Sequence, residues 1–391
     1  MTLETKTLPR IVFISTMHGP PWGGSEELWG RAATILAHEK RAQVWANVCW
    51  NPQLARPLQN LMDLGVSVER NAPLPSASLS LYRRAARSLA YRMGRRIRIP
   101  AYLEQTRPDL VVISQGAHFD GAGWMIECAN RQLRYAPIVQ CYVEGHPFAD
   151  THTDSLVRGY GEASASFFVS NTNLRCVERQ IAAPIPSGEV VRNPFNVSYE
   201  ACPPWPDTSD GLRLACVARL DLIVKGQDIL FEVLAQPKWK ARPLSVSLYG
   251  AGPNESSLRR LKELYKLDNV SFCGTTDDIE GMWRTHHGLV LTSRWEGLPL
   301  AVVEAMLCGR VCIVTEACGS ADLMENDVSG FVASAAKFDL VDDALERAWA
   351  GRGEWQAIGA RARTAVRAQV PPSPERVFAD RLLTLATQNR V

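Results

Sequence analysis

The chain has 391 residues, of which 46% are hydrophobic and 21% charged, and its 43 basic residues nearly balance 41 acidic ones, giving a net charge of +2. At roughly 100–200 residues per domain, this length predicts two or three domains. The ordinary composition, with 11 Trp, 9 Tyr and 11 Phe, excludes a disordered chain. The small net charge disfavours binding of nucleic acid through bulk charge.

The ten cysteines are scattered through apolar segments, and no two of them form a C-x-x-C pair. Zinc ribbons and thioredoxin-like redox sites are therefore disfavoured, and we expect most cysteines to be reduced core thiols in a cytoplasmic protein. Near the N-terminus a short apolar stretch, residues 11–14, runs straight into polar residues. This pattern predicts neither a signal peptide nor a membrane span.

Short apolar runs of strand length recur along the chain, with helix-length stretches between them. Near-continuous Val, Ile and Leu runs are typical of parallel strands buried on both faces. In the first half the expected strands are Ile11–Ser15, Gln43–Val48, Leu110–Ile113, Ile138–Tyr142 and Phe167–Ser170. In the second half they are Leu212–Val217, Val246–Tyr249, Val270–Cys273, Leu289–Thr292 and Val311–Val314. The pattern predicts an α/β protein with two such units.

A proline-rich segment separates the two sets of strands. Pro203, Pro204 and Pro206 would interrupt any helix or central strand there, so we expect a domain boundary. The expected units are an N-terminal domain over residues 1–195, a hinge over 196–210, a C-terminal domain over 211–370, and a C-terminal helix over 371–391 that can pack back on the first domain.

Charge is distributed unevenly along the chain. Residues 1–200 hold 21 basic and 17 acidic residues, and the remainder holds 22 and 24. Much of the first-half excess lies in residues 79–99, which contain seven arginines and no acidic residue. Apolar residues recur there at three- and four-residue spacing, which predicts a basic amphipathic helix. Such a helix can lie on an anionic membrane, bind a lipid-phosphate acceptor, or pack its apolar face on its own domain.

The segment Ser293–Gly309 follows an expected strand and has the pattern of a loop followed by a helix, with Pro299 at its first turn. The positive N-terminal end of such a helix lies at the carboxyl edge of the sheet, where ligands bind. Glu296 lies in the loop, and Glu304 follows eight positions later in the helix. Two carboxylates on one rim suit the hydroxyl pairs of a sugar or a ribose. Alternatively, they are a loop acid and an ordinary surface residue of the helix.

Arg219 and Lys225 flank a short loop that follows the expected strand Leu212–Val217. Two cations at the carboxyl edge of a sheet can neutralise a leaving diphosphate. The plainer interpretation is a pair of exposed charges in a loop between strand and helix.

A glycine-rich loop follows the first expected strand. Gly23 and Gly24 permit close approach of the backbone to a phosphate, and we expect Ser25 to cap the next helix. The spacing G-x-G-x-x-G is absent, and the second strand ends at Trp50 and Asn51 without the acid that binds a ribose. An NAD-linked oxidoreductase is therefore disfavoured.

Taken together and in this order, these segments resemble the family 4 retaining glycosyltransferases (glycosyl transferases group 1) of the GT-B fold. Beyond the residues above, the resemblance rests on Lys225-Gly226, Tyr249–Pro253 and Val270–Gly274, and it spans nearly the whole chain. It implies an α/β fold in which two Rossmann-like domains face each other across a cleft.

The resemblance also implies roles at individual positions. Arg219 and Lys225 match the pair that holds the donor diphosphate. Gly23 and Gly24 match the loop that closes on the diphosphate from the other domain, and Ser25 is included with them as a binding residue.

For the rest of the donor, Glu296 matches the acid that contacts the donor sugar, and Glu304 matches the acid that binds the nucleotide ribose. The resemblance further implies backbone contacts near the sugar from Gly297, Leu298 and Pro299, and a region beside the base at Gly274 and Thr275.

Members of this family commonly have a histidine just after the strand that is expected here at Ile138–Tyr142, where it contacts the donor sugar. In this chain Glu144, His146 or neither occupies that place. We favour His146, because a loop histidine can donate to a developing charge. Together with Glu296, these two residues are the catalytic candidates. Three other histidines are expected to be structural or solvated: His118, His286 and His287.

The implied reaction moves a sugar from a nucleotide-diphosphate donor to a hydroxyl of a glycan, lipid-linked or small-molecule acceptor, as in polysaccharide biosynthesis. It retains the configuration at the anomeric carbon, with the leaving diphosphate as the base. No cofactor is expected and no metal, since the sequence has no D-x-D and Arg219, Lys225 and a helix N-terminus can supply the positive field. The expected location is the cytoplasm, with peripheral membrane contact through residues 79–99.

Two alternatives stay open at this stage. A sugar-nucleotide epimerase or a phosphorylase of similar fold would react with the donor without an acceptor alcohol, or would require inorganic phosphate. A non-catalytic module that binds a glycan or a nucleotide would bind the donor without turning it over.

Overall fold

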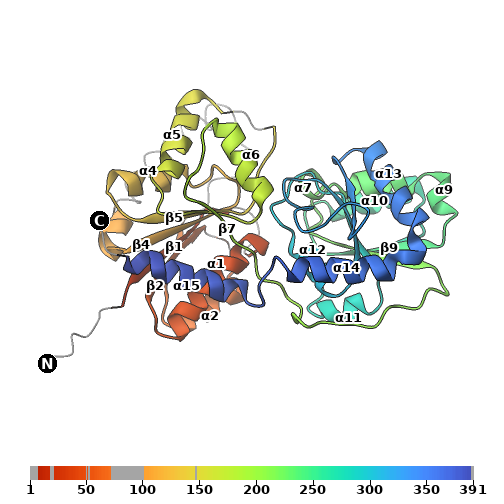
Figure 1. The fold of residues 1–391 in the computed structure, drawn as a ribbon, viewed down its shortest axis with the longest axis horizontal. Helices are drawn as coiled ribbons and strands as arrows, with labels where there is room; N and C mark the ends of the chain where they lie inside the picture. The colour runs from red at the N-terminus through yellow and green to blue at the C-terminus, as the bar shows by residue number, and fades with distance from the viewer. Residues whose placement is uncertain are drawn as a thin grey trace.

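The structure, a computed structural model, describes residues 8–17, 22–49, 51, 53–71, 101–145 and 148–388. They form two lobes, each built on a parallel sheet with helices on both faces (Figure 1). The expected α/β architecture of two Rossmann-like domains is therefore confirmed. The expected basic helix at 79–99 and His146 lie outside the described residues. Of the helices described, none is long and apolar enough to cross a membrane.

The N-terminal domain contains seven parallel strands in the order β3-β2-β1-β4-β5-β6-β7. The strands are β1 Arg10–Ser15, β2 Gln43–Cys49, β3 Ser67–Asn71, β4 Leu110–Gln115, β5 Tyr135–Val139, β6 Ser166–Phe168 and β7 Gly188–Val190. One face of the sheet is covered by α1 Gly24–His38, α2 Arg56–Asp63 and α15 Pro374–Thr387. The other face is covered by α4 Ala122–Asn130, α5 Asp150–Gly161 and α6 Asn171–Ile181.

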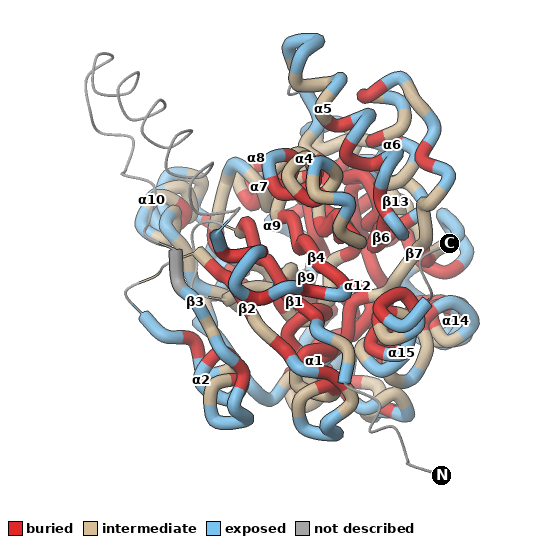
Figure 2. The backbone as a smooth tube through the Cα atoms, turned by 90° about the vertical axis from the view of Figure 1, so that its left-hand side faces the viewer, coloured by how far each residue is buried: buried red, intermediate tan, exposed pale blue. Residues whose placement is uncertain are grey.

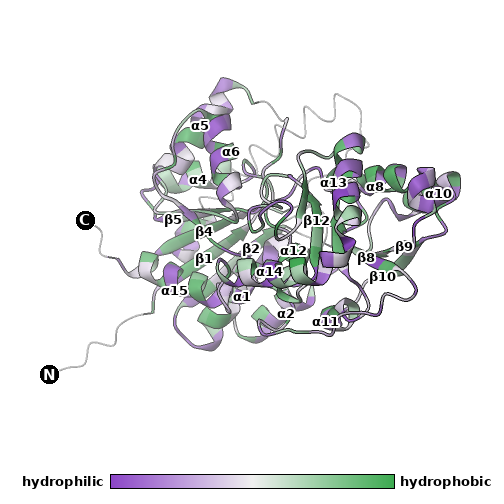
Figure 3. Cartoon of the chain, turned by 45° about the vertical axis from the view of Figure 1, so that its right-hand side comes forward, coloured by the Kyte–Doolittle hydropathy of each residue, from purple (hydrophilic) through white to green (hydrophobic). Residues whose placement is uncertain are grey.

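The two covered faces explain why the strands carry unbroken apolar runs. In β1, Ile11 and Phe13 pack in the cluster under α1 and α15, whereas Val12 and Ile14 pack in the cluster under α4 and α5. All four side chains are at most 1% exposed. Figures 2 and 3 show the same arrangement, with buried and hydrophobic residues concentrated along the sheets.

The C-terminal domain contains six parallel strands in the order β10-β9-β8-β11-β12-β13. The strands are β8 Leu212–Val217, β9 Leu244–Tyr249, β10 Val270–Gly274, β11 Gly288–Leu291, β12 Val311–Thr315 and β13 Phe331–Ala333. The helices are α7 Leu222–Lys225, α8 Gln227–Leu234, α9 Pro237–Lys240, α10 Glu255–Tyr265, α11 Ile279–Trp283, α12 Leu300–Leu307, α13 Phe338–Ala350 and α14 Trp355–Arg367.

All ten expected strands occur, although one is displaced and three more were missed. β5 ends at Val139, so the expected strand Ile138–Tyr142 was placed three residues too late. Beyond Val139 the chain leaves the sheet toward the other domain. The missed strands β3, β7 and β13 all lie at sheet edges. Edge strands are short and less buried, so they lack the long apolar run that reveals a central strand.

The cysteines largely follow the expectation of core thiols. All ten are free, and six of them are buried, whereas Cys202 and Cys273 are exposed. Cys176 of α6 and Cys318 of the C-terminal domain lie in the same core cluster. The Cys318 thiol lowers the pKa of Cys176 to about 7.

The last helix crosses back to the first domain. α14 packs on the C-terminal domain, and α15 then lies under the sheet of the N-terminal domain, beside α1 (Figure 1). The ring of Phe378 packs edge to face on Phe167, with 5.0 Å between the centroids. Arg376 pairs with Glu39 at 2.6 Å. The chain therefore connects the two domains twice.

We predict that Phe378→Ala lowers the free energy of unfolding of the N-terminal domain by about 3–5 kcal/mol, because it removes a buried aromatic ring from the core. Denaturant unfolding of the full chain measures this loss. Val377→Ala on the same helix is the control, since Val377 is 57% exposed, and it should change the value by less than about 0.5 kcal/mol. Equal effects of the two substitutions would contradict the docking of α15.

Candidate functional site

The carboxyl edges of the two sheets meet, and backbone from one domain touches backbone of the other. A Cβ atom built on Gly297 would lie 1.9 Å from the carbonyl oxygen of Gln140, across the domain boundary. A Cβ on Gly24 would lie 3.3 Å from Cδ1 of Leu300. The loops after β5 and β11 and the start of α1 and α12 therefore form one contact region. Ligands of open α/β sheets bind at this edge.

Glu296 and Lys225 are brought together at this edge. Lys225 Nζ lies 2.6 Å from Glu296 Oε1, and the hydroxyl of Ser293 donates to the same oxygen at 2.7 Å. The Glu296 side chain is 9% exposed and the Lys225 side chain 19% exposed. The lysine comes from the segment after β8 and the acid from the loop after β11, so neighbouring strands supply the pair. The second oxygen of Glu296 can still accept from a hydroxyl.

Glu304 lies inside α12 and is buried, so it is not an ordinary surface residue. Its Oε1 accepts from the backbone N–H of Asn196 at 3.0 Å and from the side-chain amide of Asn196 at 2.9 Å. Burial raises the pKa of the Glu304 carboxyl, and these two hydrogen bonds oppose that shift. The carboxylate thus faces the linker between the domains.

Arg219 lies at the carboxyl end of β8, with its side chain 40% exposed and paired with Asp221 at 2.9 Å. Asp221 caps α7, so the expected simple loop between Arg219 and Lys225 contains one short helix. Gly250 lets the adjacent backbone pass close by, since a Cβ there would lie 2.1 Å from the carbonyl oxygen of Ala218. The guanidinium is thus partly exposed beside Asp221 at this edge.

Gly23 and Gly24 open α1, but Ser25 does not cap it. The N-cap is Gly23 in an extended conformation, and Ser25 is the second helical residue. The Ser25 hydroxyl donates to the carboxylate of Glu26 and lies 2.8 Å from the Met17 sulfur. The capping prediction was wrong because the helix begins at Gly24, and a hydroxyl inside the first turn cannot reach back to cap it.

Glu26 is a buried acid that sequence analysis missed. It is 3% exposed and accepts hydrogen bonds from Ser15, Ser25 and the indole of Trp29. Burial raises its pKa. Its signal in the sequence was weak, because an acid in the first turn of a helix is ordinarily a surface residue that favours the helix dipole.

The remaining expected binding positions lie on the same side of the C-terminal sheet. Gly274 ends β10 with φ at +69° and has no atom within 4 Å of a built Cβ, and Thr275 beside it is exposed. Leu298 is 4% exposed and packs in the core, so only its backbone can contact a ligand. Pro299 is the N-cap of α12, and that helix presents its N-terminus to the region between the domains.

In the loop after β5, the Cys141 thiol lies close enough to the candidate site for the charge of Glu296 to affect its pKa. Burial raises the pKa of its thiol to about 12, with a further contribution from the charge of Glu296. Glu144 is exposed, and its charge affects the pKa values of Arg179 and Cys176 of α6 and of Cys318 in the C-terminal domain.

The three other histidines are buried rather than solvated. His118, His286 and His287 are each at most 4% exposed. His118 stacks on Tyr142 at 4.7 Å between centroids and contacts Phe119 and Phe148 edge to face. These histidines are therefore structural, as expected. Within the described ranges, no group of three His, Cys, Asp or Glu residues could hold a metal ion.

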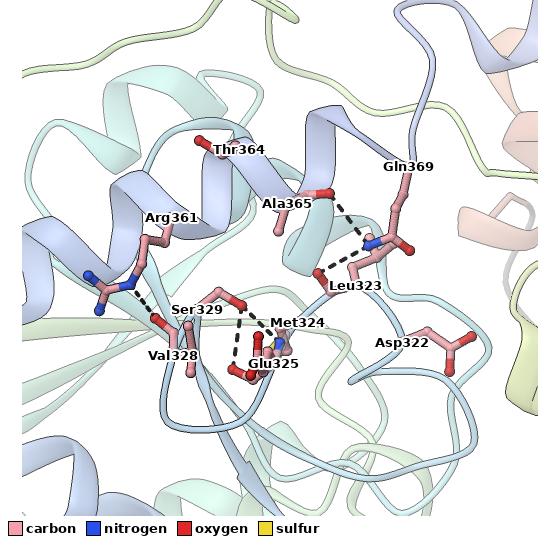
Figure 4. A pocket seen from close by; sticks show the side chains of 10 residues that line it. All are labelled: Asp322, Leu323, Met324, Glu325, Val328, Ser329, Arg361, Thr364, Ala365 and Gln369. Carbon is pink, nitrogen blue, oxygen red and sulfur yellow. Dashed lines mark hydrogen bonds between the residues drawn. The ribbon is translucent and has the colours of Figure 1, made fainter.

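A pocket elsewhere in the C-terminal domain contains none of the expected residues. It has a volume of about 530 Å³ and lies between α14 and the loop 322–329 (Figure 4). Arg361 donates to the carbonyl of Val328 at 2.7 Å, and Ser329 donates to that of Glu325. These polar groups bind within the wall of the pocket, which adds no residue to the candidate site.

Two parallel α/β domains whose carboxyl edges meet define the GT-B fold, which is the architecture of the similar solved structures. Anabaena HepE in complex with UDP superposes with a TM-score of 0.70 at 16% identity, over 96% of this chain and all of that one. A glycosyltransferase from Rickettsia africae gives a TM-score of 0.71 at 14% identity, over 98% and 100% of the two chains. At these identities the likeness establishes the fold.

Residues 211–350 match the family model of the glycosyl transferases group 1. Curated relatives match shorter stretches of the chain. An Escherichia coli UDP-Gal:alpha-D-GlcNAc-diphosphoundecaprenol alpha-1,3-galactosyltransferase is 36% identical over 74 residues, which are 19% of each chain. The Vi polysaccharide biosynthesis protein VipC/TviE of Salmonella typhi is 35% identical over 91 residues, 23% of this chain and 16% of that protein. The matches thus span about a fifth of these relatives. The C-terminal domain is thus similar in sequence to the group 1 glycosyltransferases.

We predict that Gly297→Ala separates the two domains, because the new methyl group would overlap the Gln140 carbonyl and no rotamer can relieve a clash with backbone. We expect the contact between the domains to lose about 1–3 kcal/mol of free energy. Small-angle X-ray scattering should then show a larger radius of gyration.

Gly123→Ala is the control for this substitution. Gly123 lies in α4 with nothing within 4 Å of a built Cβ, so alanine there should leave the shape unchanged. A Gly297→Ala variant as compact as Gly123→Ala would show that the domains do not meet at this point.

Proposed function

We propose that this protein is a glycosyltransferase that transfers a sugar from a nucleoside-diphosphate sugar to an acceptor hydroxyl. The observation that carries the proposal is the pairing of Lys225 with Glu296 at the carboxyl edge of the C-terminal sheet, where Gly24 of the other domain approaches Leu300 at the start of α12. The family match of the C-terminal domain and the binding of UDP by HepE support it.

In this proposal the donor occupies the C-terminal side of the contact region. Arg219 and Lys225 hold the diphosphate as charge-assisted donors, and the N-terminus of α12 adds partial positive charge. When the diphosphate binds Lys225, the ion pair between Lys225 and Glu296 breaks. Glu296 can then accept hydrogen bonds from hydroxyls of the donor sugar. Glu304 accepts from the ribose. The same cations stabilise the diphosphate as negative charge develops on it during departure.

We further propose that the reaction retains the anomeric configuration and needs no metal ion. The Cys141 thiol beside Glu296 stays protonated near neutral pH, since burial raises its pKa to about 12, and it cannot act as the base. In this proposal the departing diphosphate takes the acceptor proton. His146 and Glu144 remain candidates for a contact with the donor sugar.

Binding of nucleotides tests the donor site directly. Isothermal titration calorimetry with UDP, ADP and GDP should detect binding of at least one of them, and Arg219→Ala should weaken it about 10–100-fold, because a hydrogen bond to a charged group contributes about 1.5–3 kcal/mol. Arg352→Ala, which removes an exposed arginine that stacks on Trp349, should leave the affinity unchanged. Absence of binding by all three nucleotides would refute the donor site.

Turnover separates transfer from the alternatives. We predict that the matching nucleotide sugar is consumed only with an acceptor alcohol, that the product keeps the anomeric configuration of the donor by NMR, and that Glu296→Gln lowers kcat by about 100-fold or more. Consumption without acceptor would indicate an epimerase, a strict need for phosphate would indicate a phosphorylase, and tight binding without turnover would indicate a binding module. An inverted product would exclude retention.

A further inference from the structure

A chain of hydrogen bonds connects the first helix of the N-terminal domain to Glu304. The indole N–H of Trp22 donates to Glu27 at 2.7 Å, and Arg31 Nε donates to the same carboxylate at 2.8 Å. Arg31 NH2 then donates to Asn196 Oδ1 at 2.6 Å. Asn196 in turn donates to Glu304 through both its backbone and its side chain. We call these five residues the Glu304 relay.

The relay determines how the Glu304 carboxylate is oriented. A carboxylate that is 3% exposed needs donors, and Asn196 supplies two to one oxygen, Oε1. The Asn196 amide could in principle be turned either way. Because Arg31 has only donors, it fixes Oδ1 toward itself and thereby directs Nδ2 at Glu304. Arg31 therefore influences the orientation of the Glu304 carboxylate through Asn196, without a direct hydrogen bond to it.

One contact of the Glu304 relay, between Arg31 and Asn196, joins the two domains and therefore depends on their arrangement. The neighbours of Asn196, Phe195 and Val197, pack in the core cluster of the C-terminal domain. Asn196 thus belongs with Glu304, whereas Arg31 lies on α1 of the N-terminal domain. Arg31 NH1 also reaches the carbonyl oxygen of Phe195 at 3.3 Å. Separation of the domains would break the Arg31 contacts and leave the Asn196 amide held by Glu304 alone.

We infer that Asn196 and Arg31 are positioning residues for nucleotide binding, which hold the Glu304 carboxylate toward the ribose hydroxyls when the domains are in contact. This inference rests on the proposed function, because Glu304 binds a ribose only if the donor is a nucleotide. It makes recognition of the ribose depend on the arrangement of the domains. A nucleotide bound to Glu304 therefore favours the closed form, and closure strengthens its binding.

The test measures how strongly the protein distinguishes a ribose from a dideoxyribose. Calorimetry with UDP, ADP and GDP and with their 2′,3′-dideoxy analogues gives the ratio of the two affinities for the base that binds. For the wild type we expect a ratio on the order of 10 or more, since the hydroxyls bond to a charged group. Asn196→Ala and Arg31→Ala should reduce it by about fivefold or more.

Two further variants separate the relay from general effects on the fold. Asn196→Asp keeps an oxygen for Arg31, so the domains should stay docked, but it has no amide donor for Glu304. We therefore expect it to lower the ratio of the affinities for the ribose and dideoxyribose nucleotides as well. Thr172→Ala removes a different contact between the domains, the hydrogen bond from Thr172 to Asp322, and should keep the wild-type ratio. A merely structural weakening of the domain contact would affect Thr172→Ala as well.

The outcomes are distinct. The proposed role of the Glu304 relay would be overturned if Asn196→Ala and Asn196→Asp distinguished ribose from dideoxyribose as well as the wild type does. It would also be overturned if Thr172→Ala lost this discrimination equally. Neither result would contradict nucleotide binding itself. A wild type that binds a nucleotide with a ratio near 1 would show that Glu304 does not bind the ribose, and would overturn the relay too. A wild type that binds no nucleotide would refute the proposed function itself.

Discussion

Three buried carboxylates, two of them at the contact between the domains, constrain how the surrounding loops are arranged. Glu26, Glu296 and Glu304 are each less than 10% exposed. Burying a carboxylate costs several kcal/mol unless hydrogen bonds or a cation compensate for the lost water. Each acid therefore needs donors. Those of Glu26 are at most 11 positions away, whereas Glu296 and Glu304 bind residues 71 and 108 positions away and so connect distant elements.

These requirements connect the two halves of the molecule. Glu296 takes its cation from the segment after β8, which locks β8 to its neighbour β11. Glu304 takes its donors from the linker, and the linker is held in turn by Arg31 of the other domain. At Gly297 the absence of a side chain lets the Gln140 backbone approach closely. The closed contact limits water near the acids, which strengthens every electrostatic interaction there.

The sequence predicted the central strands and the positions of the acids better than it predicted their partners. β8 has its expected bounds because both faces are buried and the apolar run is unbroken. Edge strands such as β13 gave no such run. Arg219, Lys225, Glu296 and Glu304 were found from local patterns, since each lies at a fixed distance from a strand end.

The partners escaped sequence analysis because their contacts are not local. Asn196 and Glu304 are 108 positions apart, and Arg31 and Asn196 are 165 apart. No periodicity or motif joins such residues, and an asparagine in a proline-rich segment is an ordinary turn residue. Glu26 was missed for a related reason, since burial of a first-turn acid depends on how tightly the next loop packs over it.

The loop after β5 shows how this packing bears on the proposed chemistry. The strand ends at Val139, three residues before its expected end, so the chain brings the Gln140 carbonyl to Gly297 and the neutral thiol of Cys141 near Glu296. The buried ring of His118 stacks on Tyr142 in the same loop, which fixes its path. No described side chain of this loop can carry positive charge to the site. In the proposed reaction the developing negative charge must then be stabilised chiefly by Arg219, Lys225 and the N-terminus of α12, all on the donor side. Chemistry and donor binding would thus depend on the same groups, while the N-terminal domain would contribute closure, the acceptor and the orientation of Glu304.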